Sequence, residues 1–197
     1  MFNYPNGKKF NNLNKSIDKP VNLKASFSAA NRGMNLEESI NISNDFYVEQ
    51  GRALITKRPT PINVVKVDYT KGARIVDAYF EKQSTTDYNG IYKSKYLDFE
   101  AKSTKSKTAF PLANISKHQI EHLKRVNRLN GITFFIIQFE MYNEVYLLDG
   151  TYVIDFYESG NRKSIPYSII KEKGILIKQG YMPRLYYLDA VDLQYFH

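Results

Sequence analysis

The sequence of 197 residues contains no cysteine. This absence excludes a disulfide framework and any metal site built on thiolates, and it is typical of proteins from a reducing compartment. No apolar stretch is long enough to span a bilayer. Residues 1–9 lack the apolar core of a signal peptide. We therefore expect a cytoplasmic protein with no membrane partner.

Acidic residues are outnumbered. The chain has 20 Asp and Glu against 28 Lys and Arg, which gives a formal net charge of +8 at pH 7 and a sequence pI near 9.4. A basic excess of this size favours a polyanionic partner, with nucleic acid ahead of a membrane surface. The length suits one globular domain with a full core.

The first part of the chain differs in composition from the rest. Residues 1–31 are rich in Asn, Lys and Ser and predict a basic, weakly structured arm that either stays solvated or grips phosphates. Residues 32–197 are expected to form one domain. Its segment 62–82 reads as a long β-hairpin, which is either a surface projection that touches a polyanion or a plain pair of sheet strands.

Hydrophobic periodicity predicts the remaining elements. Helices are expected over residues 35–49, 116–130 and 167–173. Strands are expected over residues 53–55, 62–69, 74–80, 90–92, 95–102, 132–139, 144–148 and 152–157. This order predicts an α/β fold, with a mixed sheet flanked by helices in a single domain.

The segment from Thr85 to Lys102 carries the chemistry. Side chains of a strand alternate between its faces, so Asp98, Glu100 and Lys102 share a charged face, which we expect to be presented to solvent. A bend near Asn89-Gly90 would bring Asp87 opposite Glu100. Two carboxylates at one point can hold a hard divalent ion through oxygen, and the ion activates a water for phosphodiester hydrolysis. A neighbouring ammonium can orient that water and stabilise developing charge.

Glu-x-Lys by itself is common, and an exposed salt bridge on a strand is its simplest explanation. The wider sequence adds other motifs in a fixed order. These are Tyr4-Pro5-Asn6-Gly7-Lys8, residues 31–37, residues 57–61, residues 84–92, Asp98-Phe99-Glu100-Ala101-Lys102 and His118-Gln119-Ile120-Glu121-His122. Together they closely resemble the RecU family of bacterial Holliday junction resolvases over essentially the full chain.

The resemblance implies a restriction-endonuclease-like fold with a protruding β-hairpin stalk at about residues 60–83. It also implies a homodimer that depends on Mg²⁺, with Mn²⁺ as a substitute, and that cuts four-way DNA junctions symmetrically in recombination and repair. We expect 5′-phosphate products from attack of a metal-polarised water. Recombinase and branch-migration proteins are candidate partners. Thr86 stands where the broader nuclease pattern has proline, a departure that RecU proteins share.

The resemblance also implies roles for the residues of this chain that match the family's motifs. Asp87 and Glu100 match the principal metal ligands, Thr85 and Gln119 match further residues of the metal site, and Lys102 matches the transition-state stabiliser. Glu37 matches an acidic residue of the first helix that faces the active site. Basic residues of the arm, the segment after the first strand and the stalk are expected to bind DNA: Arg32, Lys57, Arg58, Lys66, Lys71 and Arg74.

Three alternatives accompany this interpretation. Ser116 and Gln119 also form a capping box, in which Gln119 would only bond back to the Ser116 amide. Residues 118–122 read as H-x-x-E-H, the motif of an inverted zinc peptidase. Finally, the basic arm and hairpin would also serve a DNA-binding protein without catalytic activity.

Overall fold

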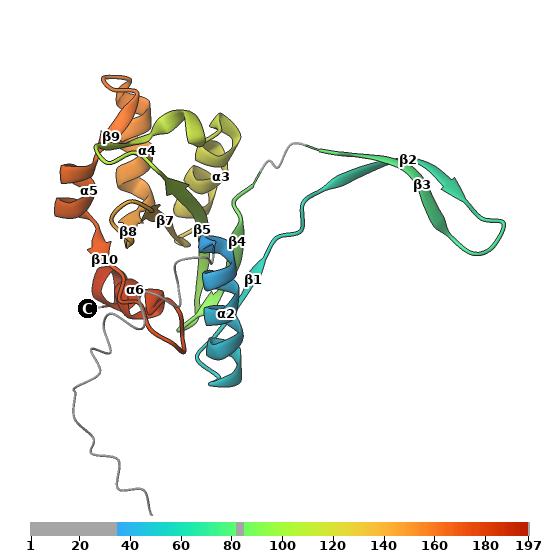
Figure 1. The fold of residues 1–197 in the computed structure, drawn as a ribbon, viewed down its shortest axis with the longest axis horizontal. Coiled ribbons are helices and arrows are strands. Elements are labelled where there is room, and N and C mark those ends of the chain that lie inside the picture. Colours follow the sequence, from blue (N-terminus) through green and yellow to red (C-terminus); the bar gives the residue numbers. More distant parts are fainter. Residues whose placement is uncertain (1–34, 82–84, 197) are drawn as a thin grey trace, which may run out of the picture. The chain divides into compact units, whose positions relative to one another are not determined.

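The structure is a computed structural model that describes residues 35–81 and 85–196. The predicted arm at 1–31 and Arg32 therefore lie outside the described residues. A six-stranded sheet has the order β1-β4-β5-β7-β8-β10 (Figure 1). Its strands are β1 (Ala53–Lys57), β4 (Tyr88–Tyr92), β5 (Lys95–Thr104), β7 (Ile132–Phe139), β8 (Glu144–Asp149) and β10 (Ile175–Leu176).

Among the strands of the described residues, only the β5–β7 pair is parallel, and the helix between them, α3 (Lys117–Arg128), makes the crossover that a parallel pair requires. One core lies between the sheet and the helices α2 (Leu36–Glu49) and α6 (Tyr187–Tyr195). A second core lies against α3, α4 (Gly150–Ser159) and α5 (Tyr167–Lys173). The predicted fold class, a mixed sheet flanked by helices, is confirmed.

Smaller elements close the second core. The strands β6 (Ala109–Pro111) and β9 (Ser164–Pro166) pair with each other, and the 3-10 helix η1 (Leu112–Asn114) follows β6. None of the helices described in 35–81 and 85–196 has the length and apolar character that a membrane crossing requires.

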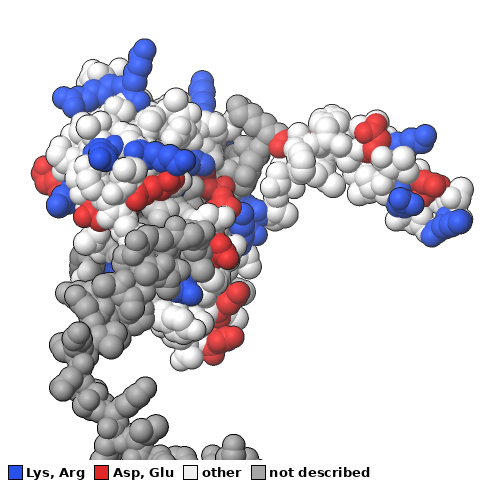
Figure 2. Space-filling model, viewed as in Figure 1, with Lys and Arg blue, Asp and Glu red and all other residues white. Residues whose placement is uncertain are grey.

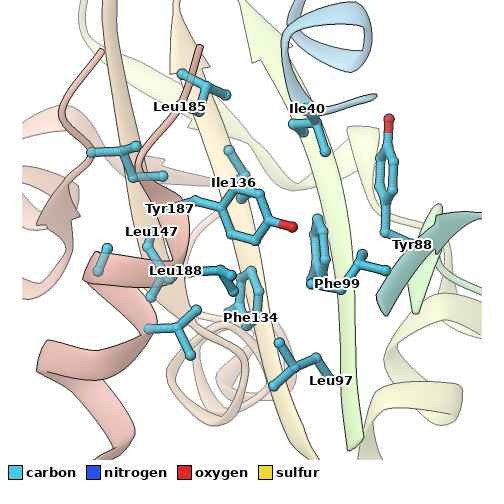
Figure 3. Packing of buried hydrophobic residues seen from close by; sticks show 14 of the residues in the cluster. Ile40, Tyr88, Leu97, Phe99, Phe134, Ile136, Leu147, Leu185, Tyr187 and Leu188 are labelled. Carbon is cyan, nitrogen blue, oxygen red and sulfur yellow. The ribbon is translucent and has the colours of Figure 1, made fainter. Parts of the chain in front are cut away.

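Three aromatic rings stack across the centre of the sheet. Tyr88, Phe99 and Phe134 come from β4, β5 and β7, and all three are fully buried. The ring centroids lie 5.0 Å apart between Tyr88 and Phe99, and 4.5 Å apart between Phe99 and Phe134 (Figure 3). Stacked rings at these distances stabilise cross-strand pairs. The stack therefore holds the register of β5 directly beside Glu100.

The connection between β4 and β5 differs from the predicted one. The turn lies at Lys93 and Ser94, whose φ angles are +45° and +62°, as a two-residue hairpin turn of this type requires. Gly90 lies inside β4 instead, where a Cβ atom would come within 2.1 Å of the Leu54 carbonyl oxygen. The register Tyr88–Phe99 still carries Asp87 to the level of Glu100, so the predicted juxtaposition holds although the predicted bend is wrong.

The strand predicted over residues 152–157 is also wrong, because this segment belongs to α4. Asp149 caps the helix by accepting a hydrogen bond from the Tyr152 amide at 3.1 Å, and Gly160 ends it at φ +64°. These start and stop signals outweigh the apolar character of the segment, which fits either element. The helix α6, near the chain end, was not predicted.

The predicted hairpin is present as β2 (Ile62–Asp68) and β3 (Arg74–Phe80), which pair only with each other (Figure 1). Near its base the two faces differ. On one face, Asn63 donates to the Tyr79 hydroxyl at 2.9 Å and to Glu81 at 3.1 Å. The opposite face carries exposed apolar side chains, namely Ile62, Val64, Ala78 and Phe80.

Candidate active site

The two predicted carboxylates, Asp87 and Glu100, lie next to each other on the face of the β4–β5 pair that α3 covers. Glu100 is fully buried and Asp87 is 9% exposed. The Asp87 amide donates to Glu100 Oε2 at 3.2 Å, and Asp87 Oδ2 accepts from the Ala101 amide at 3.2 Å. The ammonium of Lys102 contacts Glu100 Oε1 and lies 3.9 Å from Asp87 Oδ2. Strand alternation therefore places these groups on one face as predicted, but α3 covers that face, which we had expected to be open.

Gln119 forms the predicted capping box and also contacts Glu100. Its Oε1 accepts from the Ser116 amide at 2.9 Å, and the Gln119 amide donates back to Ser116 Oγ at 3.3 Å, which completes the capping box. Its Nε2 donates to Glu100 Oε1 at 2.5 Å. The cap thus fixes the side chain that holds Glu100, so the start of α3 and the carboxylate site are structurally coupled.

The electrostatics of Glu100 are unusual. Burial, together with the nearby Asp87 carboxylate, raises the pKa of Glu100 to about 8, although the Lys102 ammonium opposes the rise. Such a carboxyl group is partly protonated near neutral pH unless another positive charge compensates it. Oxygen atoms from two carboxylates form the donor set that a hard divalent cation prefers. The residues therefore fit a divalent metal ion.

The other predicted residues named next are more exposed than this pair. Glu37 forms an ion pair with Lys57 at 2.6 Å, and both side chains are more than two-fifths exposed. Thr85 is half-buried. The hairpin residues Lys66, Lys71 and Arg74 are all exposed, and Figure 2 shows Lys and Arg toward the turn end of the hairpin with acidic side chains among them.

Arg58 was predicted to contact DNA, but it lies in a cluster that the sequence did not identify. Its side chain is 19% exposed and pairs with the fully buried Asp98 at 2.7 Å. His122 Nε2 lies 2.9 Å from Asp98 Oδ2, and Thr86 Oγ1 contacts Asp98 Oδ1. Two signals pointed to this cluster: Asp98 shares a strand face with Glu100, and His122 follows Gln119 by one helical turn.

The same contacts weaken the zinc-peptidase alternative. His122 is engaged by Asp98, whereas His118 is exposed on α3. Within residues 35–81 and 85–196, no three side chains of His, Asp or Glu converge as metal ligands. A zinc site of that class needs two histidines and a third protein ligand directed at one point, and residues 118–122 do not supply it.

Comparisons with known proteins identify the family of this chain. The family model "RecU: Recombination protein U" matches residues 31–193. The chain belongs to the RecU family. Proteins named Holliday junction resolvase RecU from Bacillus cytotoxicus (strain DSM 22905) and Bacillus cereus (strain B4264) are each 48% identical over 198 residues, which covers 98% of this chain and 98% of theirs. The structure of Archaeoglobus fulgidus Hjc, a Holliday junction resolvase, covers 70% of this chain and 94% of its own at a TM-score of 0.40 and 11% identity.

The raised pKa of Glu100 makes a prediction about the RecU chain without metal. A protonated Glu100 stabilises the folded state fully below its ordinary value of 4.5, and this contribution is lost as the pH rises toward 8. Glu100→Gln keeps a neutral side chain at every pH. We expect the variant to melt above the wild type at pH 8, with a difference that shrinks at pH 5. Each kcal/mol corresponds to about 2–4 °C in a domain of this size.

The measurement is thermal unfolding in EDTA across this pH range. Glu158→Gln is the control, because Glu158 is about half-exposed on α4 and the same substitution there should leave the pH dependence unchanged. Adding Mn²⁺ at pH 8 should raise the melting temperature of the wild type more than that of Glu100→Gln. Parallel curves for Glu100→Gln and wild type would contradict the electrostatic account of Glu100.

Proposed function

We propose that this chain is a Holliday junction resolvase, a divalent-metal-dependent endonuclease that makes paired incisions in four-way DNA junctions. The observation that carries the proposal is the buried Asp87–Glu100 pair with the Lys102 ammonium beside it. Family membership supports it, since the matched relatives bear the name of that activity. Two adjacent carboxylates with one ammonium beside them would repel phosphate unless a cation neutralised them, which favours a metal-dependent nuclease over a DNA-binding protein without catalysis.

In this mechanism Asp87 and Glu100 would hold Mg²⁺ or Mn²⁺, with Thr85 and Gln119 assisting directly or through water. The chemistry that such an ion would supply is neutralisation of phosphate charge and a lowered pKa of a water molecule. Gln119 Nε2 donates to Glu100 Oε1 and the Ala101 amide donates to Asp87 Oδ2, so both carboxylates are held in place by hydrogen bonds. Lys102 presents its ammonium where negative charge develops on the scissile phosphate. The expected products carry a 5′-phosphate.

Asp87→Asn and Lys102→Ala test the catalytic assignment. Asparagine removes one of the two negative charges that hold the ion, and alanine removes the ammonium. We expect each variant to lose at least about 10²-fold in the rate of Mg²⁺-dependent cutting. Binding to a synthetic four-way junction in EDTA should remain within twofold of wild type.

Asp155→Asn, at an exposed position on α4, is the matched control and should cut normally. Cleavage is measured on a mobile four-way junction with linear duplex as the second substrate, with and without Mg²⁺ or Mn²⁺. A wild-type protein that binds the junction but leaves it intact with either metal would overturn the proposal in favour of a DNA-binding protein without activity.

The hairpin is proposed as the element that favours branched DNA. Lys66, Lys71 and Arg74 are exposed on it, and phosphate contacts from cations release counterions, which makes binding depend steeply on salt. We expect alanine at all three positions to reduce the preference for junction over duplex. The slope of log affinity against log salt concentration should become shallower by about 2–3.

The control removes three exposed cations elsewhere, with Lys171→Ala, Lys173→Ala and Lys178→Ala. It lowers the net charge equally but should keep the junction preference. Affinities for junction and duplex are measured by titration at several salt concentrations. If both triple variants lose affinity alike, general charge rather than the hairpin accounts for binding.

A homodimer is proposed as the active form, because two equivalent sites related by a two-fold axis match paired incisions. The apolar face of the hairpin supports it. Phe80 is 78% exposed, Ile62 46% and Val64 40%. An isolated two-stranded hairpin is marginally stable in water, and an exposed apolar patch of this kind is typical of an interface. A second copy of the chain would cover this face.

Val64→Glu tests this surface, since a buried charge at an interface opposes association. We expect wild-type protein to sediment as a dimer and the variant to shift toward monomer while its far-UV circular dichroism is unchanged. Leu54→Glu is the control, because Leu54 is a 60% exposed apolar residue on the edge strand β1. If Leu54→Glu dissociates the dimer and Val64→Glu does not, the interface lies at the β1 edge of the sheet instead.

A further inference from the structure

A third buried carboxylate lies beside the proposed catalytic pair of Asp87 and Glu100. Asp98 is fully buried on β5. It accepts from Arg58 Nη2 at 2.7 Å and from the Tyr96 hydroxyl at 2.9 Å, and it contacts Thr86 Oγ1 and His122 Nε2. A buried carboxylate is stable only when it is paired and hydrogen-bonded. Here four neighbouring side chains meet that need.

This arrangement repeats the one around Glu100. In both, a carboxylate on β5 meets one residue from the segment that leads into β4 and one residue from α3. For Glu100 these are Asp87 and Gln119, and for Asp98 they are Thr86 and His122. Residues 119 and 122 are one turn apart on the same face of α3. Strand β5, the segment that leads into β4 and helix α3 are therefore joined twice. We call the contacts around Asp98 the Asp98 level and those around Glu100 the Glu100 level.

Arg58 ties the two levels together. Its backbone amide donates to the Asp87 carbonyl oxygen at 2.8 Å. Its Nη1 donates to Thr86 Oγ1 at 2.6 Å and lies 3.3 Å from the Thr86 carbonyl oxygen. Because this carbonyl and the Asp87 amide belong to one peptide unit, Arg58 restrains the backbone on both sides of the Asp87 side chain.

The charge balance separates the two levels. The guanidinium of Arg58 gives the Asp98 level a permanent counter-charge, since arginine is always protonated. The Arg58 side chain is mostly buried and already directed at Asp98, Thr86 and Tyr96. A phosphate contact from Arg58 would require these bonds to break and would leave Asp98 buried without its cation, which is costly. The geometry therefore favours an internal role for Arg58 over DNA contact.

We propose that Arg58, Asp98 and His122 form a positioning layer that holds Asp87 and Gln119 around Glu100 in the geometry that binds the divalent ion. This inference rests on the proposed metal-dependent function. Residues that orient metal ligands through hydrogen bonds typically contribute 10–100-fold to metal affinity or activity. Arg58 and His122 are positioning residues, because neither touches the reacting atoms.

The test uses the full chain and Arg58→Met, with Mn²⁺ as the probe. We expect the Mn²⁺ dissociation constant, measured by calorimetry, to rise about 10-fold or more. The cleavage rate at saturating junction should fall by a similar factor and recover in part at high Mn²⁺ concentration. Junction affinity in EDTA should stay within twofold of wild type, because the positioning layer does not contact DNA.

Arg52→Met is the matched control. Arg52 forms an ion pair with Asp189 at 3.1 Å, away from the carboxylate site, so the variant should bind Mn²⁺ and cut like wild type. His122→Gln, which keeps a hydrogen-bond donor for Asp98, should lose less Mn²⁺ affinity than His122→Leu. This graded pair keeps the proposal falsifiable if Arg58→Met does not fold.

Two results would overturn the positioning layer. Unchanged Mn²⁺ affinity in both Arg58→Met and His122→Leu is one. The other is a loss of junction affinity in EDTA by Arg58→Met with normal Mn²⁺ binding, which would make Arg58 a DNA contact. A wild type that neither binds Mn²⁺ nor cuts junctions would instead overturn the proposed function itself.

Discussion

The burial of two carboxylates on one strand is the constraint on which this structure depends. Strand β5 is covered on both faces: Phe99 lies in the aromatic stack on one side, while Asp98 and Glu100 face α3 on the other. Buried carboxylates require compensation. The Arg58 guanidinium compensates the charge of Asp98. Burial by itself raises the pKa of Asp98, but the hydrogen bonds from His122, Arg58 and Thr86 bring this pKa below its ordinary value. Glu100 keeps a raised pKa.

This difference in charge compensation suits the two neighbouring carboxylates to different roles. The Asp98 level is closed by protein groups, so it holds β4, β5 and α3 at fixed spacing. Among residues 35–81 and 85–196, the Glu100 level has one ammonium, that of Lys102, against two acids, so a further positive charge would stabilise it. A fixed layer beside an incompletely compensated one is the arrangement expected of a preorganised metal site.

The hairpin follows a different physical rule. Its strands bury little against the rest of the described chain, and every residue of β3 is exposed. Such an element is expected to gain stability from a binding partner, and its base and its turn end suggest different partners. Exposed apolar side chains near the base suit a second copy, and cations toward the turn suit a polyanion (Figure 2). In the proposed function, recognition and catalysis thus belong to different elements of the chain.

The sequence by itself determined the strand face that carries Glu100 and Lys102, the two-stranded hairpin and the capping box at Ser116, because these depend on local periodicity and short-range hydrogen bonds. The expected pairing of the two neighbouring strands placed Asp87 opposite Glu100, and the order of the motifs added Thr85, Gln119 and Glu37 as proposed site residues. Only the tertiary structure decided that Gln119 caps α3 and holds Glu100 at once, and that Arg58 turns inward to Asp98. It also made residues 152–157 a helix. These outcomes depend on which elements pack together, and no single segment encodes that packing.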